Sequence, residues 1–218
     1  MLSPTSPPLP RPQPTDTPTA APATPTPTPT PTLAPGWHTL NDTSYSDAEG
    51  WVHVLGEIVN NTAANQEDVL LTVSFYDELD RQIGGEPTAP IVEVIPQGSK
   101  VPFSLETELR APYERYEITV DAVPTDREPR TDLEVLNHAG TTGEIYIITG
   151  EVYNPGNPLL AYAEVIATLY DDAGLVVNVG YSFLPAGDLG SGQTASFEVL
   201  VEQPHGSIAG YELVVLGF

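Results

Sequence analysis

Two clusters of acidic side chains are the densest groups of potential metal ligands in the chain. They are Asp77-Glu78 with Asp80, and Asp171-Asp172. Calcium takes about six to eight oxygen ligands from a loop with set spacing and a glycine at its sharp turn. Neither cluster has the Asp-x-Asp-x-Asp-Gly spacing of a calcium loop. Asp77, Asp80, Asp171 and Asp172 therefore either form acidic hairpin turns or contribute to a weak surface site, with Ca²⁺ as the only candidate cofactor.

Nucleophilic and metal-assisted chemistry find little support in the sequence. The chain has no Cys, which excludes thiol catalysis and Cys-based zinc sites. The four histidines share no metal-ligand spacing, and no Gly-x-Ser-x-Gly, His-Glu-x-x-His or P-loop motif is present. His38 and His138 lie near corresponding positions of the two halves, and structural roles are expected for both. We predict no catalytic residue and no enzyme activity.

Two tryptophans, Trp37 and Trp51, could serve as a ligand platform. An exposed Trp pair would suit stacking on sugar rings. The alternative is that these side chains seal the edge of the first domain. Carbohydrate binding by Trp37 and Trp51 is kept as a candidate function on this basis.

A Tyr-Asp pair occurs twice, as Tyr76-Asp77 and Tyr170-Asp171, each at the end of an apolar run and before a turn. In the structural interpretation, Tyr packs across a sheet while Asp accepts hydrogen bonds from the backbone of the turn. In the functional interpretation, the pair faces a ligand at one end of the domain. The duplication of the motif next to a turn favours the structural interpretation.

The charge of the chain limits its partners. The formal net charge is -23, and all seven Lys and Arg residues precede residue 131. Nucleic-acid affinity depends on cationic side chains that displace counterions, so nucleic-acid binding is excluded. Anionic membrane surfaces are excluded for the same reason. No apolar run approaches the ~20 residues that span a bilayer, so no membrane insertion is expected.

Alternating apolar and polar residues indicate β-strands beyond Pro35. Leu71, Val73 and Phe75 alternate with polar residues, and the segment 115–123 has the same period of two. No segment has a convincing helical period. The expected core positions, which are the inward side of these strands, are Val54, Ile58, Leu71, Val73, Phe75, Phe103, Ile118 and Val120, followed by Ile148, Val152, Val165, Leu169, Phe197, Leu213 and Val215.

Residues 3–35 have a different composition, dominated by Pro and Thr, with strict alternation from Thr24 to Thr32. Such a segment has almost nothing to bury, so it is expected to be disordered. Repeated Pro favours polyproline II, which would give a reach of about 100 Å. The segment is therefore predicted to be a stalk.

The chain also contains an internal repeat with an offset of 94 residues. Residues 56–60 (GEIVN) superimpose on 150–154 (GEVYN), and Phe75-Tyr76-Asp77 superimposes on Leu169-Tyr170-Asp171 without a gap. Two copies of this length indicate a domain duplication rather than a solenoid, whose repeats are shorter. About seven short strands per copy are expected of an immunoglobulin-like sandwich.

The repeated motif resembles that of the FxLYD domain, a bacterial sandwich module found in exported proteins and lipoproteins. It appears here as residues 73–77 (VSFYD) and 167–171 (ATLYD), so neither copy keeps the first Phe of the family motif. The resemblance implies an all-β fold of two tandem immunoglobulin-like β-sandwich domains. It implies no catalytic or cofactor-binding residues.

The expected organisation is a disordered stalk at 1–35, a first domain at 36–124, a linker at 125–130 and a second domain at 131–218. The expected function is that of a non-catalytic, extracytoplasmic cell-envelope display protein that binds an unknown protein or envelope component. The alternatives are a carbohydrate-binding module and a structural spacer with cation-bridged acidic surfaces. No charged or apolar export region follows Met1, so we expect the export signal or lipoprotein anchor to lie upstream.

Overall fold

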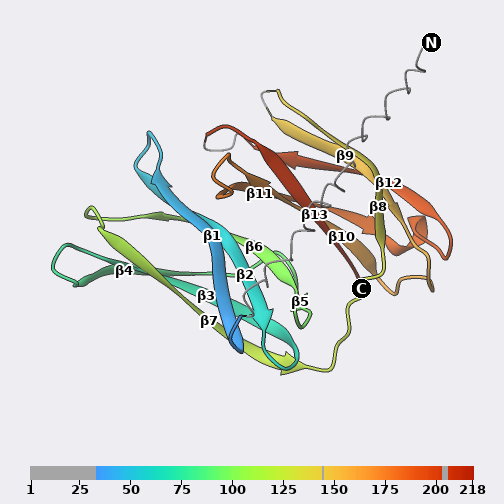
Figure 1. Ribbon diagram of the computed structural model, residues 1–218, viewed down its shortest axis with the longest axis horizontal. Helices are drawn as coiled ribbons and strands as arrows, with labels where there is room; N and C mark the ends of the chain where they lie inside the picture. Colours follow the sequence, from blue (N-terminus) through green and yellow to red (C-terminus); the bar gives the residue numbers. More distant parts are fainter. Residues whose placement is uncertain (1–32, 144, 203–205) are drawn as a thin grey trace, which may run out of the picture. The chain divides into compact units, whose positions relative to one another are not determined.

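Antiparallel β-strands make up nearly all of the regular structure in this protein (Figure 1). The computed structural model describes residues 33–143, 145–202 and 206–218. The predicted Pro/Thr stalk therefore lies almost wholly outside the described residues. Within these, the only helix is the single 3-10 turn η1 (Ala186–Asp188), so the all-β prediction is confirmed.

Strands β1–β7 form what we call the first half of the fold. They are β1 (Gly36–Ser46), β2 (Trp51–Asn61), β3 (Asn65–Tyr76), β4 (Gln82–Thr88), β5 (Val94–Ile95), β6 (Lys100–Glu108) and β7 (Arg115–Thr125). One sheet has the order β1-β2-β6, and in the other β3 pairs with β4, β5 and β7.

Strands β8–β13 form the second half. They are β8 (Glu134–Thr141), β9 (Tyr146–Tyr153), β10 (Tyr162–Tyr170), β11 (Val176–Pro185), β12 (Thr194–Val201) and β13 (Gly210–Gly217). The sheets have the orders β12-β9-β8 and β11-β10-β13. The position that β5 holds in the first half is taken here by η1, about 94 residues later, so the described residues of the second half form six strands where about seven were expected.

Two hydrophobic clusters fill the space between the paired sheets. The first contains Phe75 and Phe103, and the second contains Leu169 and Phe197. Every core residue expected from the alternation lies in one of the clusters or packs against it. Alternation predicted these positions correctly because successive side chains of a strand point to opposite faces of the sheet, so every second side chain faces the core.

The two halves share buried apolar surface. Ile166 of β10 and Leu216 of β13 belong to the first cluster although they lie in the second half, and both are almost fully buried. Arg130, in the connector, forms an antiparallel bridge with Gly217. Residues 33–218 accordingly form one compact unit.

The sequence repeat is also a repeat of hydrogen bonds. Asn60 is fully buried, and its side-chain amide donates to the carbonyls of Ala64 and Ile95. Asn154, 94 residues later, is equally buried and donates to the carbonyls of Asn157 and Leu189. Buried backbone carbonyls need such partners, so each Asn fixes the loop that closes its own half.

A glycine of the repeat permits close packing in each half. A Cβ atom on Gly56 would lie 2.8 Å from Cζ of Phe103, and one on Gly150 would lie 2.7 Å from Cζ of Phe197. Real Cβ atoms do not approach other heavy atoms this closely, so only Gly fits beneath the two aromatic rings.

Candidate functional site

The carboxylates of the two acidic turns, which are the candidate metal ligands, accept hydrogen bonds from the backbone of their own hairpins. Oδ1 of Asp77 accepts hydrogen bonds from the backbone N–H groups of Leu79 and Arg81. Oδ1 of Asp171 accepts the same two bonds from Ala173 and Leu175. Both carboxylates therefore hold a hairpin turn in place.

The other two acidic candidates do not complete a metal site. Asp80 adopts a positive φ of 59° in its turn and pairs with Arg115. Asp172 is in the turn that follows β10. Among the described residues, no group of three or more His, Cys, Asp or Glu side chains is placed to hold a metal ion.

The paired tyrosines occupy equivalent positions in different surroundings. The Tyr76 hydroxyl donates to Glu117, and the Arg115 guanidinium lies over the ring at 4.0 Å from its centroid. The Tyr170 hydroxyl lies 3.1 Å from Glu212, and Nζ of Lys100 lies 5.4 Å from the ring centroid. The first half thus supplies its own cation, whereas the second half receives Lys100 from the first.

A polar cluster around the buried side chain of Glu57 joins the two halves at this point, and we call it the Glu57 cluster. The Tyr170 hydroxyl donates a 2.6 Å hydrogen bond to Glu57, and Nζ of Lys100 is 2.8 Å from the same Oε1 atom. Nζ of Lys100 also pairs with Glu212 at 2.8 Å, and Asn41 donates to the other oxygen of Glu57. Both oxygens of the buried Glu57 carboxylate thus have partners, as burial requires.

Ionisation in the Glu57 cluster follows from these contacts. Burial alone would lower the pKa of Lys100, but its hydrogen bonds to Glu212, Glu57 and Tyr170 raise it well above the ordinary value. Burial and the hydrogen bond to Glu57 raise the pKa of Tyr170. The cluster therefore holds a protonated Lys and a neutral phenol across the neutral pH range.

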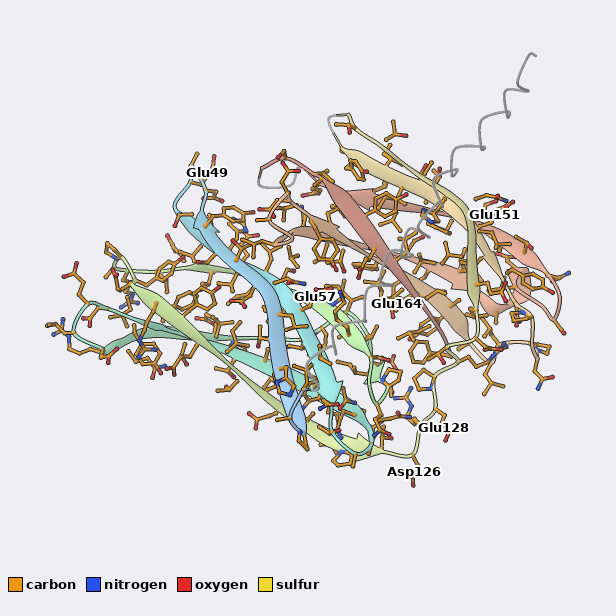
Figure 2. The ribbon with its side chains drawn as sticks, viewed as in Figure 1. Glu49, Glu57, Asp126, Glu128, Glu151 and Glu164 are labelled. Atoms are coloured by element: carbon orange, nitrogen blue, oxygen red, sulfur yellow. The ribbon has the colours of Figure 1, made fainter. Side chains whose placement is uncertain are left out.

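A second buried carboxyl, that of Glu164, lies on the same face of β10 as Tyr170 but has a different environment. Glu164 of β10 is 1% exposed, and its Oε1 atom has no hydrogen-bond partner. Burial, and then the charge of Glu93, raise the pKa of Glu164 to about 7. Glu57 and Glu164 are both labelled in Figure 2, on β2 and β10 respectively.

Beside these buried groups lies a cleft of about 660 Å³, which has walls from both halves. Strands β1, β2 and β6 provide Tyr45, His53, Leu55 and Glu106, while β11 and the end of β12 provide the opposing side chains. Ligand sites in proteins commonly enclose about 300–1,000 Å³. The cleft is therefore a concave feature of suitable size for a ligand, with walls from both halves.

The floor of the cleft is a row of side chains in register. Tyr45 is paired with His53, and His53 with Glu106, so all three side chains lie on one face of the sheet. The rings of Tyr45 and His53 stack at 4.7 Å with an interplanar angle of 9°. Nε2 of His53 is 3.0 Å from Asp47, whose pKa this contact lowers.

The two tryptophans do not form a common platform. Trp37 is paired with Asn60 and packs against the first hydrophobic cluster. Trp51 is at the other end of β2 and is 40% exposed. Alternation along β2 places Trp51 on the same face as His53, which is opposite to the Trp37 face.

The histidine correspondence expected from the sequence is wrong. His138 accepts or donates a hydrogen bond with the Tyr211 hydroxyl at 2.8 Å, and Asp42 makes the equivalent contact with Tyr116. His138 therefore corresponds to Asp42. The two-residue loop difference between the copies, which aligns Leu40 with Leu136, already carried this signal.

Sequence reasoning missed the cleft residues Tyr45, Tyr181 and Glu106 and the contact made by Lys100. Lys100 is 112 residues from Glu212, and no local pattern joins such positions. One available signal was the composition of β10 and β13. Val165-Ile166-Ala167 and Val214-Val215-Leu216 are apolar on consecutive positions, which indicates strands covered on both faces.

The part of the chain that the structure describes contains no helix with the length and apolar character of a membrane span. Comparison with protein families gives no matching family model, and comparison with curated proteins gives no match.

Proposed function

We propose that this chain is a non-catalytic cell-envelope display protein, in which two tandem immunoglobulin-like domains of the FxLYD type bind a protein or another envelope component. The first domain would comprise residues 36–124 and the second residues 131–218, joined by a linker at 125–130. The Pro/Thr-rich segment 1–35 would act as a disordered stalk that holds the pair at the cell surface or in the secreted state.

The repeated loop and turn geometry supports two domains of one type. Asn60 and Asn154 close equivalent loops, and Asp77 and Asp171 hold equivalent turns. Phe75 and Leu169, the apolar residues of the motif, are fully buried in separate clusters. The motif residues thus carry folding roles, which leaves binding to the surfaces between and around the domains.

The cleft between the two halves is the observation that carries the proposed function. It forms only where the halves meet, and the Glu57 cluster fixes that meeting by hydrogen bonds across the halves. A pair held in this way presents a preorganised surface, which reduces the entropy lost on binding. A binding role is therefore favoured over a passive spacer.

Co-sedimentation of the full chain with cell-envelope fragments tests this function. Tyr181 is 51% exposed in the cleft, and Leu79 is 71% exposed on a distant hairpin. We expect the chain to co-sediment, Tyr181→Ala to weaken the binding, and the matched surface variant Leu79→Ala to have no effect. Equal binding by both variants, or no binding of the unmodified chain, would contradict the proposal.

Carbohydrate binding is a second candidate because Trp51 is exposed on the cleft face of β2. An exposed indole ring can stack on a sugar, as aromatic platforms do. A glycan array separates this candidate from the first. Binding to a neutral glycan that Trp51→Ala abolishes, in a variant with an unchanged Tm, would favour it.

A further inference from the structure

We propose that the cleft between the two halves binds the lysine or arginine side chains of a basic peptide segment. This ligand class rests on the proposed binding function and specifies the chemistry of the partner. The inference follows from three properties of the cleft, which are its aromatic rings, its carboxylates and the lack of lysine and arginine among its described lining residues.

Aromatic and aliphatic side chains of both halves face the cleft. Tyr181 and Leu200 of the second half are 51% and 52% exposed, and Val179 lies beside them. Tyr45 and Leu55 line the first half. A lysine or arginine side chain has an aliphatic stem that packs on such surfaces while its charged end remains near water.

Carboxylates provide the partners for the charged end. Glu106 and Glu202 line the cleft from opposite halves. The side chain of Glu106 is 59% exposed, and Nδ1 of His53 lies 3.9 Å from its carboxylate. His53 makes its closer contact, at 3.0 Å, with Asp47. Glu106 is therefore available to a ligand.

Among the described residues that line the cleft there is no lysine or arginine. The segment 131–218 contains no Lys or Arg, and the formal net charge of the chain is -23. The resulting field attracts cations and raises the rate at which a basic partner is captured. It repels nucleic acids and acidic polymers, which leaves a basic peptide as the charged macromolecule that fits.

The aromatic rings add specificity for the cation. An ammonium or guanidinium group over a tyrosine face is attracted by the negative face of the ring. The same contact is already present within the protein, at Lys100 over Tyr170 and at Arg115 over Tyr76. Tyr181 offers an exposed ring for the same interaction with a ligand.

Fluorescence anisotropy with labelled octapeptides tests the inference on the full chain. One peptide alternates glycine with lysine, a second alternates glycine with arginine, and a third replaces the basic residues by glutamine. The variants are Tyr181→Ala, which keeps the net charge, and Glu106→Gln, which removes one cleft carboxylate. Glu128→Gln is the charge-matched control, because Glu128 is exposed in the connector and is not a cleft residue (Figure 2).

The expected result is binding of both basic peptides and no binding of the glutamine peptide. Tyr181→Ala should weaken binding by about tenfold and Glu106→Gln by about threefold, while Glu128→Gln matches the unmodified chain. Equal affinity of all variants would show nonspecific charge attraction and overturn the inference. Equal binding of the glutamine peptide, or no binding of any peptide, would also overturn it.

Failure of the ligand class is distinguishable from failure of the proposed function. Loss of envelope co-sedimentation in Tyr181→Ala, with no binding of basic peptides, overturns the ligand class and keeps the binding function. Binding of basic peptides in the cleft, with envelope co-sedimentation unaffected by Tyr181→Ala, supports the ligand class and contradicts the proposed function.

Discussion

The Tyr170 hydroxyl donates a 2.6 Å hydrogen bond to the buried carboxylate of Glu57, a residue 113 positions earlier in the chain. This bond joins the face of β10 to the face of β2. Lys100 forms an ion pair with Glu57 and lies over the ring of Tyr170. Three kinds of interaction therefore join the two halves at this position. The cleft lies beside the surface that these contacts hold together.

Removal of the Tyr170 hydroxyl should destabilise the fold much more than the same change at Tyr76. Tyr170→Phe leaves the buried Glu57 without one donor, which should cost about 1–3 kcal/mol. Tyr76→Phe removes an exposed bond to Glu117 and should cost less than about 0.5 kcal/mol. Urea unfolding of both variants measures the difference. Equal losses of unfolding free energy in the two variants would show that the hydroxyl of Tyr170 does not bond a buried Glu57 carboxylate.

Stability should decrease as the pH rises from about 4.5 to about 7. Glu164 has a pKa raised from 4.5 to about 7 by burial and by Glu93. Below about pH 4.5 the Glu164 carboxyl is protonated in both the folded and the unfolded chain. Between about pH 4.5 and about 7 it ionises only in the unfolded chain. The free energy of unfolding should therefore fall by about 3 kcal/mol over this range.

Replacement of Glu164 tests this origin directly. Glu164→Gln should remove most of the slope between pH 5 and 7 in thermal unfolding and raise the Tm at pH 8. Below about pH 4 the variant and the unmodified chain should both lose stability, because carboxyls with lowered pKa values, such as Asp47 and Asp77, become protonated. An unchanged slope in the variant would assign the dependence to other groups.

The core and the turns could be predicted from the sequence because both depend on local patterns. Val73 and Phe75 point inward because side chains alternate along a strand. Asp77 and Asp171 hold their turns because an Asp side chain bonds the backbone two residues later. These effects act within one strand or one turn, so a single sequence displays them.

The contact between the halves depends on which face meets which, and a local pattern does not give that information. Ile166, Val214 and Leu216 lie on the face of β10 and β13 that packs against the first half. The repeat aligns them with the polar residues Thr72, Thr119 and Asp121 of the first half. This exchange of apolar for polar residues identifies the contact face only when the positions of the strands in their sheets are known. Because the first half has polar residues at these positions, its equivalent face is not apolar.

Loss of a loop-closing asparagine should be among the most destabilising single changes. Asn60 is fully buried and its amide satisfies the carbonyls of Ala64 and Ile95. Asn60→Ala leaves both carbonyls unpaired, and a loss of about 2–4 kcal/mol is expected. Asn61→Ala, at the next position and more exposed, is the control and should cost less than about 1 kcal/mol. Similar losses in chemical unfolding would contradict the role of Asn60.

Calcium should not raise the thermal midpoint of the protein. The Asp77 carboxylate already accepts bonds from the Arg81 side chain and from the backbone of the turn, and these would have to be displaced. A ligand that binds only the folded state raises the midpoint. Calorimetry with and without millimolar Ca²⁺ measures this, with Mg²⁺ as the control. A rise specific to Ca²⁺ that Asp171→Asn abolishes would restore the structural-spacer function.

Measurement of the distance between the two halves shows directly whether they are docked in one fixed arrangement. The chain has no Cys, so spin labels can be placed uniquely through Glu86→Cys on β4 and Glu198→Cys on β12. A fixed pair of halves predicts a single narrow distance distribution in pulsed electron paramagnetic resonance, which broadens in Tyr170→Phe. A broad distribution in the chain without this substitution would contradict the docked arrangement and, with it, the cleft.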